Sequence, residues 1–234
     1  MAEPAGPLQN QFVLNTLSLY HGPRVKMKIG SHDYEYLVSK DLLCSKSAYF
    51  STMFNGPSQE SQEQAATLEE GEGLSVRTFN ALIQWLYTGE VKFNVKDRSE
   101  KILDAIELAR VALMWNVSDL ESPTAEYIKR IILRNDFQNF SSNVRYIGSD
   151  HIASVCLLPS GNSVRQMLAA ASVEEFFLVD TFKLAKEAQE NPEFAADLLH
   201  EIHEPLRRVM GRLEYSNQMR DLFEDPLSGR PFPV

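Results

Sequence analysis

The first clear pattern in the chain is an alternation of apolar and polar residues. Val25, Met27 and Ile29 alternate with Lys26 and Lys28, which is the period of a half-buried β-strand. The segment Ser-His-Asp at 31–33 has turn chemistry, and the strand-like segment YEYLVSK follows it at 34–40. The pattern therefore predicts a β-hairpin near the start of the chain.

After the hairpin the apolar period lengthens to that of a helix. Apolar pairs at 42/43, 49/50 and 53/54 recur at intervals that place them on one helical face. Gly56 and Pro57 predict the end of this helix. The segment AATLEEGEG at 65–73 predicts one short strand and a solvated acidic turn.

Helical patterns dominate the rest of the first 133 residues. Stripes at i, i+3, i+4 and i+7 predict helices within 75–89 and 99–115, and Ser122 with Pro123 predicts the capped start of a third. The stripes consist of Phe79, Leu82, Ile83 and Leu86, with Gly89 as the stop, and of Ile102, Ile106, Ala109 and Leu113.

The C-terminal part is also predicted to be helical. Ser172 and Glu175 have the spacing of a capping box for a helix that continues to Ala188. A helix is expected to restart at Pro192 and to be interrupted at Pro205. We thus expect a loosely ordered lead-in over 1–24, an α+β domain over 25–133, a helical extension over 134–226 and a tail over 227–234.

Composition and charge narrow the function. The chain is 44% hydrophobic and 24% charged, close to average globular usage, and no apolar stretch reaches the ~20 residues of a membrane span. Its net charge of −9 is spread along the chain, which disfavours nucleic acid as a partner. Two cysteines predict no disulfide framework and suit a reducing compartment, the cytoplasm or the nucleus.

The common signatures of catalysis are missing from the sequence. It lacks GxxxxGK[ST], GxGxxG, GxSxG and HExxH. His200 and His203 are one helical turn apart, but a metal site needs a third ligand, so we interpret them as surface residues. Cys44 is interpreted as a buried, inert thiol. We predict no catalytic residue, no metal site and no cofactor.

Several stretches in the right order resemble a BTB/POZ domain over residues 25–133. They are VKMKIG, YEYLVSKDLLCSKSAYF, MFNGPSQES, TFNALIQWLYTGEV and LDAIELARVALMWNV. The resemblance implies a small, mainly antiparallel sheet flanked by a helical cluster. It is greatest to the fungal proteins that have a single BTB domain and a helical C-terminal extension.

The resemblance implies a non-catalytic protein-interaction module. Members of the family act as regulatory scaffolds or as substrate adaptors of cullin–RING ubiquitin ligases, so the candidate partners are a cullin scaffold and a second copy of the chain. The matching positions for partner contact are Phe54, Ser58, Gln59, Glu60 and Tyr87.

Two departures from the family pattern weaken these expectations. Ser58 is polar where cullin-binding members have an apolar anchor, and losing an anchor costs about 1–3 kcal/mol of binding free energy. Arg24 and Ser39 replace a charged pair found near the core of family dimers, so we expect self-association to be weaker or to use another surface.

A second hypothesis is a small-molecule or catalytic role in a cleft between the BTB domain and the extension. A deep polar pocket containing His151, His200 or His203 would favour it. An exposed apolar patch rimmed by charge would favour the interaction module instead.

Overall fold

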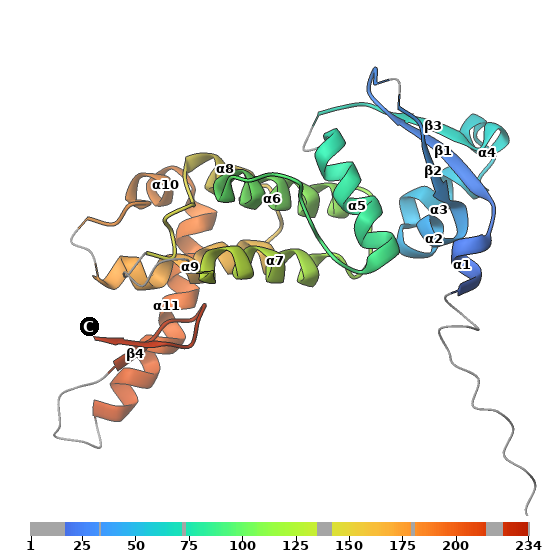
Figure 1. Cartoon of the computed structure of the whole chain (residues 1–234). Coiled ribbons are helices and arrows are strands. Elements are labelled where there is room, and N and C mark those ends of the chain that lie inside the picture. The colour runs from blue at the N-terminus through green and yellow to red at the C-terminus, as the bar shows by residue number, and fades with distance from the viewer. Residues whose placement is uncertain are drawn as a thin grey trace, which may run out of the picture.

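A computed structural model describes residues 17–32, 34–71, 74–134, 142–178, 181–213 and 222–233. The chain forms an elongated body with a small sheet at one end and a cluster of helices at the other (Figure 1). Residues 1–16 of the expected lead-in lie outside the described part. Its remainder contains helix α1 (Leu17–His21) and the first residue of β1. No helix among the described residues is long and apolar enough to cross a membrane.

The sheet has three strands with β1 in the centre. β1 (Arg24–Ile29) pairs antiparallel with β2 (Tyr36–Ser39) and parallel with β3 (Ala65–Leu68). The predicted hairpin and the predicted third strand are both present, but the sheet is mixed rather than mainly antiparallel. Val25, Met27 and Ile29 are fully buried, as the alternation predicts.

The single helix expected over residues 40–56 is instead two helices. α2 (Lys40–Lys46) and α3 (Ala48–Asn55) are separated by Ser47, whose backbone is extended. Its hydroxyl accepts a hydrogen bond from the Phe50 amide (3.2 Å) and donates one to the Trp115 carbonyl (2.6 Å). This hydroxyl stabilises the break, which the apolar spacing alone does not reveal.

The next helices are α4 (Gln59–Glu63), α5 (Val76–Thr88), α6 (Arg98–Met114) and α7 (Glu121–Leu133). Gly89 ends α5 with a φ of 73°, as predicted. Two expectations are wrong: Leu113 is 53% exposed, and Ser122 does not cap α7. That helix begins at Glu121, two residues before the expected first helical residue Pro123, and it follows the buried Leu120 without a side-chain cap.

The extension contains α8 (Ser149–Val155), α9 (Ser163–Leu178), α10 (Ala185–Glu190) and α11 (Pro192–Leu213). The predicted capping box at Ser172 is wrong, because this serine lies inside α9 and its hydroxyl donates to the Leu168 carbonyl (2.9 Å). The helix expected to continue to Ala188 ends at Leu178. Pro205 lies inside α11 without ending it.

A hairpin takes the place of the tail expected over 227–234. It consists of β4 (Leu222–Glu224) and β5 (Pro231–Pro233). Phe223 and Phe232 are buried, and both rings pack against Phe177 of α9. The hairpin therefore covers the C-terminal end of the helical cluster.

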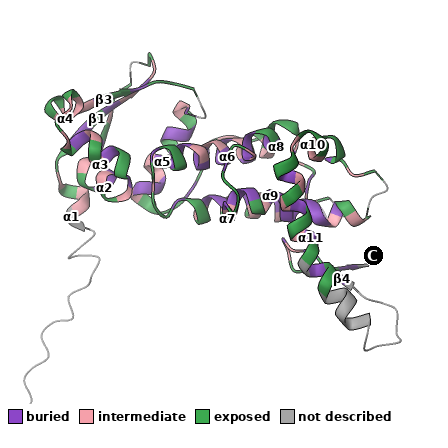
Figure 2. Cartoon of the chain, turned by 180° about the vertical axis from the view of Figure 1, so that it is seen from behind, coloured by how far each residue is buried: buried purple, intermediate pink, exposed green. Residues whose placement is uncertain are grey.

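One hydrophobic core runs through the BTB-like part and the extension. Its buried residues extend from Val25 in β1 to Phe194 in α11 and Leu227 beyond it. In Figure 2 buried segments appear from β1 and α5 at one end of the molecule to α9 at the other, with exposed segments between them. The expected boundary near residue 133 is therefore no boundary in the packing.

A buried arginine connects helices α9 and α11 of the extension. Arg165 of α9 is 6% exposed, and its Nε donates to Asp197 of α11. Its two Nη atoms donate to the carbonyls of Leu158 and Glu193, each at 3.0 Å. These partners offset the free-energy cost of removing the guanidinium charge from water. An isolated buried charge would have no such compensation.

We expect Arg165→Met to lower the free energy of unfolding by about 3–5 kcal/mol, because it leaves the Asp197 carboxylate without its partner. Urea denaturation of the full chain measures the loss. The double variant Arg165→Met/Asp197→Leu removes both charges and should regain a large part of it. A single variant as stable as the wild type would show that the ion pair does not hold α9 to α11.

Candidate protein-interaction site

The residues with the strongest sequence case for partner contact lie where α3 ends and α4 begins. We call residues 54–64 the α3–α4 corner. The Phe54 carbonyl at its start accepts hydrogen bonds from Lys40 Nζ (2.8 Å), Ser61 Oγ (2.9 Å) and Gln64 Nε2 (3.3 Å). Because donors from α2 and from α4 and its C-cap all bind the Phe54 carbonyl oxygen, these hydrogen bonds fix the position of α4 relative to α2 and α3.

Ser58 is the N-cap of α4. Its Oγ accepts a hydrogen bond from the Ser61 amide (3.2 Å) and donates one to the Met53 carbonyl (2.8 Å). The side chain is half-buried. A hydroxyl with these two bonds is structural, so Ser58 positions α4 rather than offering a polar group to a partner.

Two of the five candidate residues are packed into the fold. Phe54 is fully buried and stacks on Phe50 at 6.3 Å between ring centroids, so its side chain is not available for partner contact. Tyr87 is half-buried; its hydroxyl accepts a hydrogen bond from the Ser39 amide (2.8 Å), and its ring meets Tyr20 of α1 edge to face. Both residues are therefore part of the packing of the fold.

Of the candidate residues on α4, Gln59 is exposed and Glu60 is half-buried. With Glu63 they line one side of a hollow of about 400 Å³, and Lys26 and Lys28 on the outer face of β1 line the other. The hollow thus presents carboxylates and ammonium groups side by side. The sequence pattern assigned both lysines to an exposed strand face but did not show that α4 lies beside them.

The two positions expected to weaken dimerisation are neighbours on the sheet. Arg24 pairs with Ser39 in the register of β1 and β2. Ser39 is 1% exposed; its hydroxyl donates to the Leu19 carbonyl of α1 and accepts from the Leu42 amide as the N-cap of α2. Only Arg24 is exposed, so Ser39 has no side-chain group left for a second copy.

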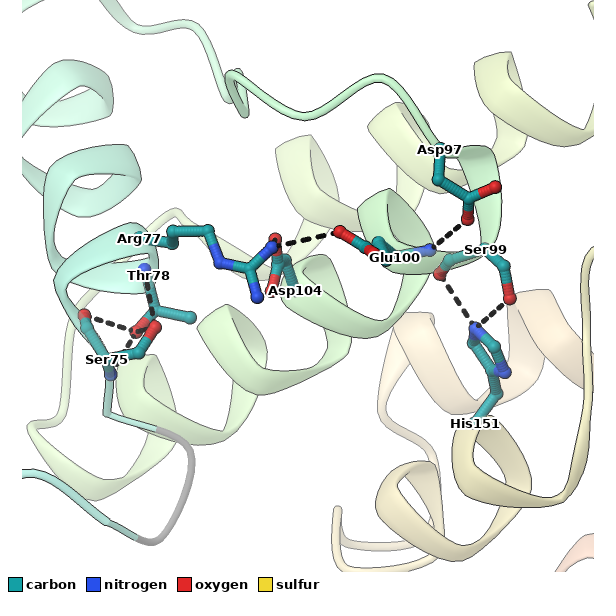
Figure 3. A network of polar contacts seen from close by, with 8 residues as sticks. All are labelled: Ser75, Arg77, Thr78, Asp97, Ser99, Glu100, Asp104 and His151. Atoms are coloured by element: carbon teal, nitrogen blue, oxygen red, sulfur yellow. Dashed lines mark hydrogen bonds and ion pairs between the residues drawn. The ribbon is translucent and has the colours of Figure 1, made fainter.

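His151, a candidate for a catalytic cleft, is used to join α8 to α6. Its Nδ1 accepts from the Gly148 amide (3.1 Å), and its Nε2 lies 2.9 Å from the Ser99 carbonyl (Figure 3). This pairing requires the neutral ring with its proton on Nε2. The histidine is 5% exposed, which fits a structural role.

The other candidate chemistry does not assemble into a reactive centre. His200 lines a polar hollow of about 270 Å³ with Glu201, Glu224 and Asp225, which lies within the extension and is smaller than the ~300–1,000 Å³ of typical ligand pockets. Among the residues that the structure describes, no three metal-ligating side chains gather. Burial raises the pKa of the Cys44 thiol, which disfavours the reactive thiolate.

A charged network connects α5 and α6 close to the hairpin. Arg77 Nη1 lies 3.2 Å from Glu100 Oε2 and 3.3 Å from Asp104 Oδ2 (Figure 3). Asp104 is 8% exposed, and Oδ2 has no hydrogen bond despite the nearby guanidinium. Burial raises the pKa of Asp104, Arg77 opposes this shift, and Glu100 and Glu107 add to it.

Comparison with known families agrees with this architecture. Residues 24–130 match the family model described as the BTB/POZ domain. No curated protein matches the chain. The match begins at the first residue of β1 and ends inside α7, before the extension.

We expect Ser58→Ala to lower the free energy of unfolding by about 1 kcal/mol, because α4 loses its N-cap. Gln59→Ala is the matched control: it removes only the exposed bond to Glu63 and should cost less than ~0.5 kcal/mol. Urea denaturation of both variants measures the difference. Equal effects would show that the Ser58 cap does not stabilise the corner.

Asp104→Asn should raise stability at neutral pH, since the desolvation that raises the pKa of Asp104 outweighs the attraction to Arg77. A carboxyl with a raised pKa is protonated more readily in the folded state than in the unfolded chain. The contribution of Asp104 to wild-type stability therefore falls as the pH rises above the ordinary aspartate pKa of about 3.9. The advantage of the variant should therefore shrink as pH falls towards 4. Thermal unfolding from pH 4 to 7.5 tests this; a pH-independent difference would contradict it.

Proposed function

Because residues 24–130 form a BTB/POZ domain, we propose that this chain is a non-catalytic interaction protein that contacts its partner through α4 and the hollow beside it. BTB/POZ domains are generally protein–protein interaction modules and are typically non-enzymatic. The observation that carries the proposal is the α3–α4 corner, which displays Gln59 and Glu60 on a short helix fixed by internal hydrogen bonds. The partner class that we propose is the cullin scaffold of a ubiquitin ligase.

Rigidity of the corner favours binding. Association costs free energy when side chains and loops must be ordered, and a preformed surface avoids part of that cost. Lys40, Ser61 and Gln64 already hold the Phe54 carbonyl, and Ser58 already caps α4. Binding then has to immobilise the side chains of Gln59 and Glu60.

Ser58 limits affinity for a cullin in a different way from that expected from sequence. A larger apolar residue there would add contact area, but it would also remove the cap of α4 and the bond to Met53. The gain expected from Ser58→Met is therefore offset by a loss of about 1 kcal/mol in the helix that carries Glu60. Glu60 is the cleaner position for a test.

The structure supports a single interaction body rather than an enzyme with a cleft between two parts. The packing between the BTB domain and the extension is continuous, and the ring nitrogens of His151 are both engaged within it. The hollow beside His200 lies between α11 and the C-terminal hairpin. We therefore assign the extension a supporting and partner-selecting role.

The test is a calorimetric titration of a recombinant cullin N-terminal region into the full chain. We expect Glu60→Ala to weaken binding about tenfold, the loss expected of a central polar contact worth about 1.4 kcal/mol. Glu126→Ala is the control, because it removes the same charge from an exposed position on α7.

Two results would count against the proposal. Tight binding that Glu60→Ala leaves unchanged would place the interface away from α4. A wild-type chain that fails to bind any cullin N-terminal region would remove the ligase-adaptor role.

A further inference from the structure

A second hollow lies at the far end of β3 from α4. Its volume is about 570 Å³, and it is lined by the hairpin turn, the segment after β3 and the first turns of α5. Tyr34, Tyr36 and Val76 supply apolar walls, and His32, Glu70 and Arg77 supply polar groups. We call it the tyrosine pocket. Its size and mixed lining are those of a ligand-binding site.

The two tyrosines form an aromatic corner. Their ring centroids are 4.7 Å apart with the planes at 84°, and Tyr36 is held from behind by Phe79 of α5 at 4.9 Å. Tyr34 is 67% exposed, which is unusual for a large aromatic side chain that is not part of an interface. The face of an aromatic ring carries partial negative charge and attracts cations.

The charges around the pocket also favour a cation. Arg77 is the guanidinium in the lining, and it is already paired with Glu100 and Asp104. Glu70 lies on the opposite side, where its Oε1 is 3.3 Å from His32 Nε2, and its side chain is 43% exposed. With Arg77 engaged by its own partners, the half-exposed carboxylate of Glu70 is the acceptor that the pocket offers to a cation.

We propose that the tyrosine pocket binds an arginine side chain of a partner segment. A guanidinium is planar and weakly hydrated, so it stacks on a tyrosine face while donating two parallel hydrogen bonds to a carboxylate. Tyr34 and Tyr36 provide the stacking surface, and Glu70 provides the acceptor. An ammonium group matches this arrangement less well, because it is a strongly hydrated point charge without a flat face.

A second copy of this chain, bound through its own β3 edge, is a poorer candidate for the partner at the tyrosine pocket. Glu69 and Glu70 follow β3, and Glu60 and Glu63 precede it, so two β3 edges would bring like charges together. The same carboxylates attract a basic segment. The proposal does not depend on the α3–α4 corner or on a cullin, since the pocket is at the other end of the strand.

The test uses the full chain labelled with ¹⁵N and three probes: the tripeptides acetyl-Gly-Arg-Gly-amide, acetyl-Gly-Lys-Gly-amide and acetyl-Gly-citrulline-Gly-amide. Citrulline has the shape of arginine without its charge. We expect the arginine peptide to shift the amide signals of Tyr34, Tyr36, Glu70 and Val76 with a dissociation constant on the order of 1 mM. The lysine peptide should bind roughly threefold more weakly and the citrulline peptide at least about tenfold more weakly.

Three variants at two positions separate the aromatic and the electrostatic contributions. Tyr34→Leu should weaken arginine binding, whereas Tyr34→Phe should retain it, because the ring face survives. Glu70→Gln should weaken it about tenfold while keeping the size of the side chain. Both side chains are exposed, so unchanged amide signals elsewhere will show that the variants fold.

The outcomes that overturn the proposal are distinct. Equal binding of the citrulline or lysine peptide would show a pocket that does not select arginine, and no localised shift would show that the pocket does not bind it. Wild-type affinity in both Tyr34→Leu and Glu70→Gln would place the peptide elsewhere. Glu60→Ala should bind the tripeptide like the wild type, so failure here is separable from failure of the cullin titration.

Discussion

Helix α6 must be buried over more than half of its circumference, and the rest of the structure is arranged to do this. Its buried residues include Asp104, Ala105, Ile106, Leu108 and Ala109, which at 100° per residue spread over about 200° around the axis. One neighbouring helix cannot cover so wide a buried face. Here α5, α7 and α8 all pack against it. The partners of α6 therefore come from both the BTB/POZ domain and the extension.

This constraint explains why the family match and the folded unit differ in extent. The match ends at residue 130, yet α8 lies beyond it and supplies the third wall around α6. Polar contacts reinforce that wall: Ser154 of α8 donates to Glu107, and His151 pairs with the Ser99 carbonyl. Removing the extension would expose apolar surface and leave Glu107 and Ser99 without these partners. The extension is accordingly part of the same body and not an appended module.

Sequence alone predicted the elements whose signal is local and missed those decided by distant contacts. The alternation at Val25–Ile29 and the helix end at Gly89 depend only on the local backbone conformation, and both predictions were confirmed. Ser47 breaks a helix by bonding to Trp115, far along the chain, and Ser172 looked like a cap although α9 had begun nine residues earlier. In the candidate site, spacing could not show that the side chain of Phe54 points into the core, and partner contact by Gln59 and Glu60 on α4 stays a prediction.

The two surfaces that we propose for partner contact lie at the two ends of one strand. The α3–α4 corner lies at the start of β3 and the tyrosine pocket at its end. β3 has four residues and is therefore about 13 Å long. An extended partner segment of four or five residues is long enough to span this distance and contact Glu60 with one part and Glu70 with another. Because β3 is an edge strand of the sheet, main-chain groups on its outer side point towards the position of such a segment. An edge strand offers main-chain hydrogen bonds to an added strand, and in our proposal Glu70 at its end favours a basic one.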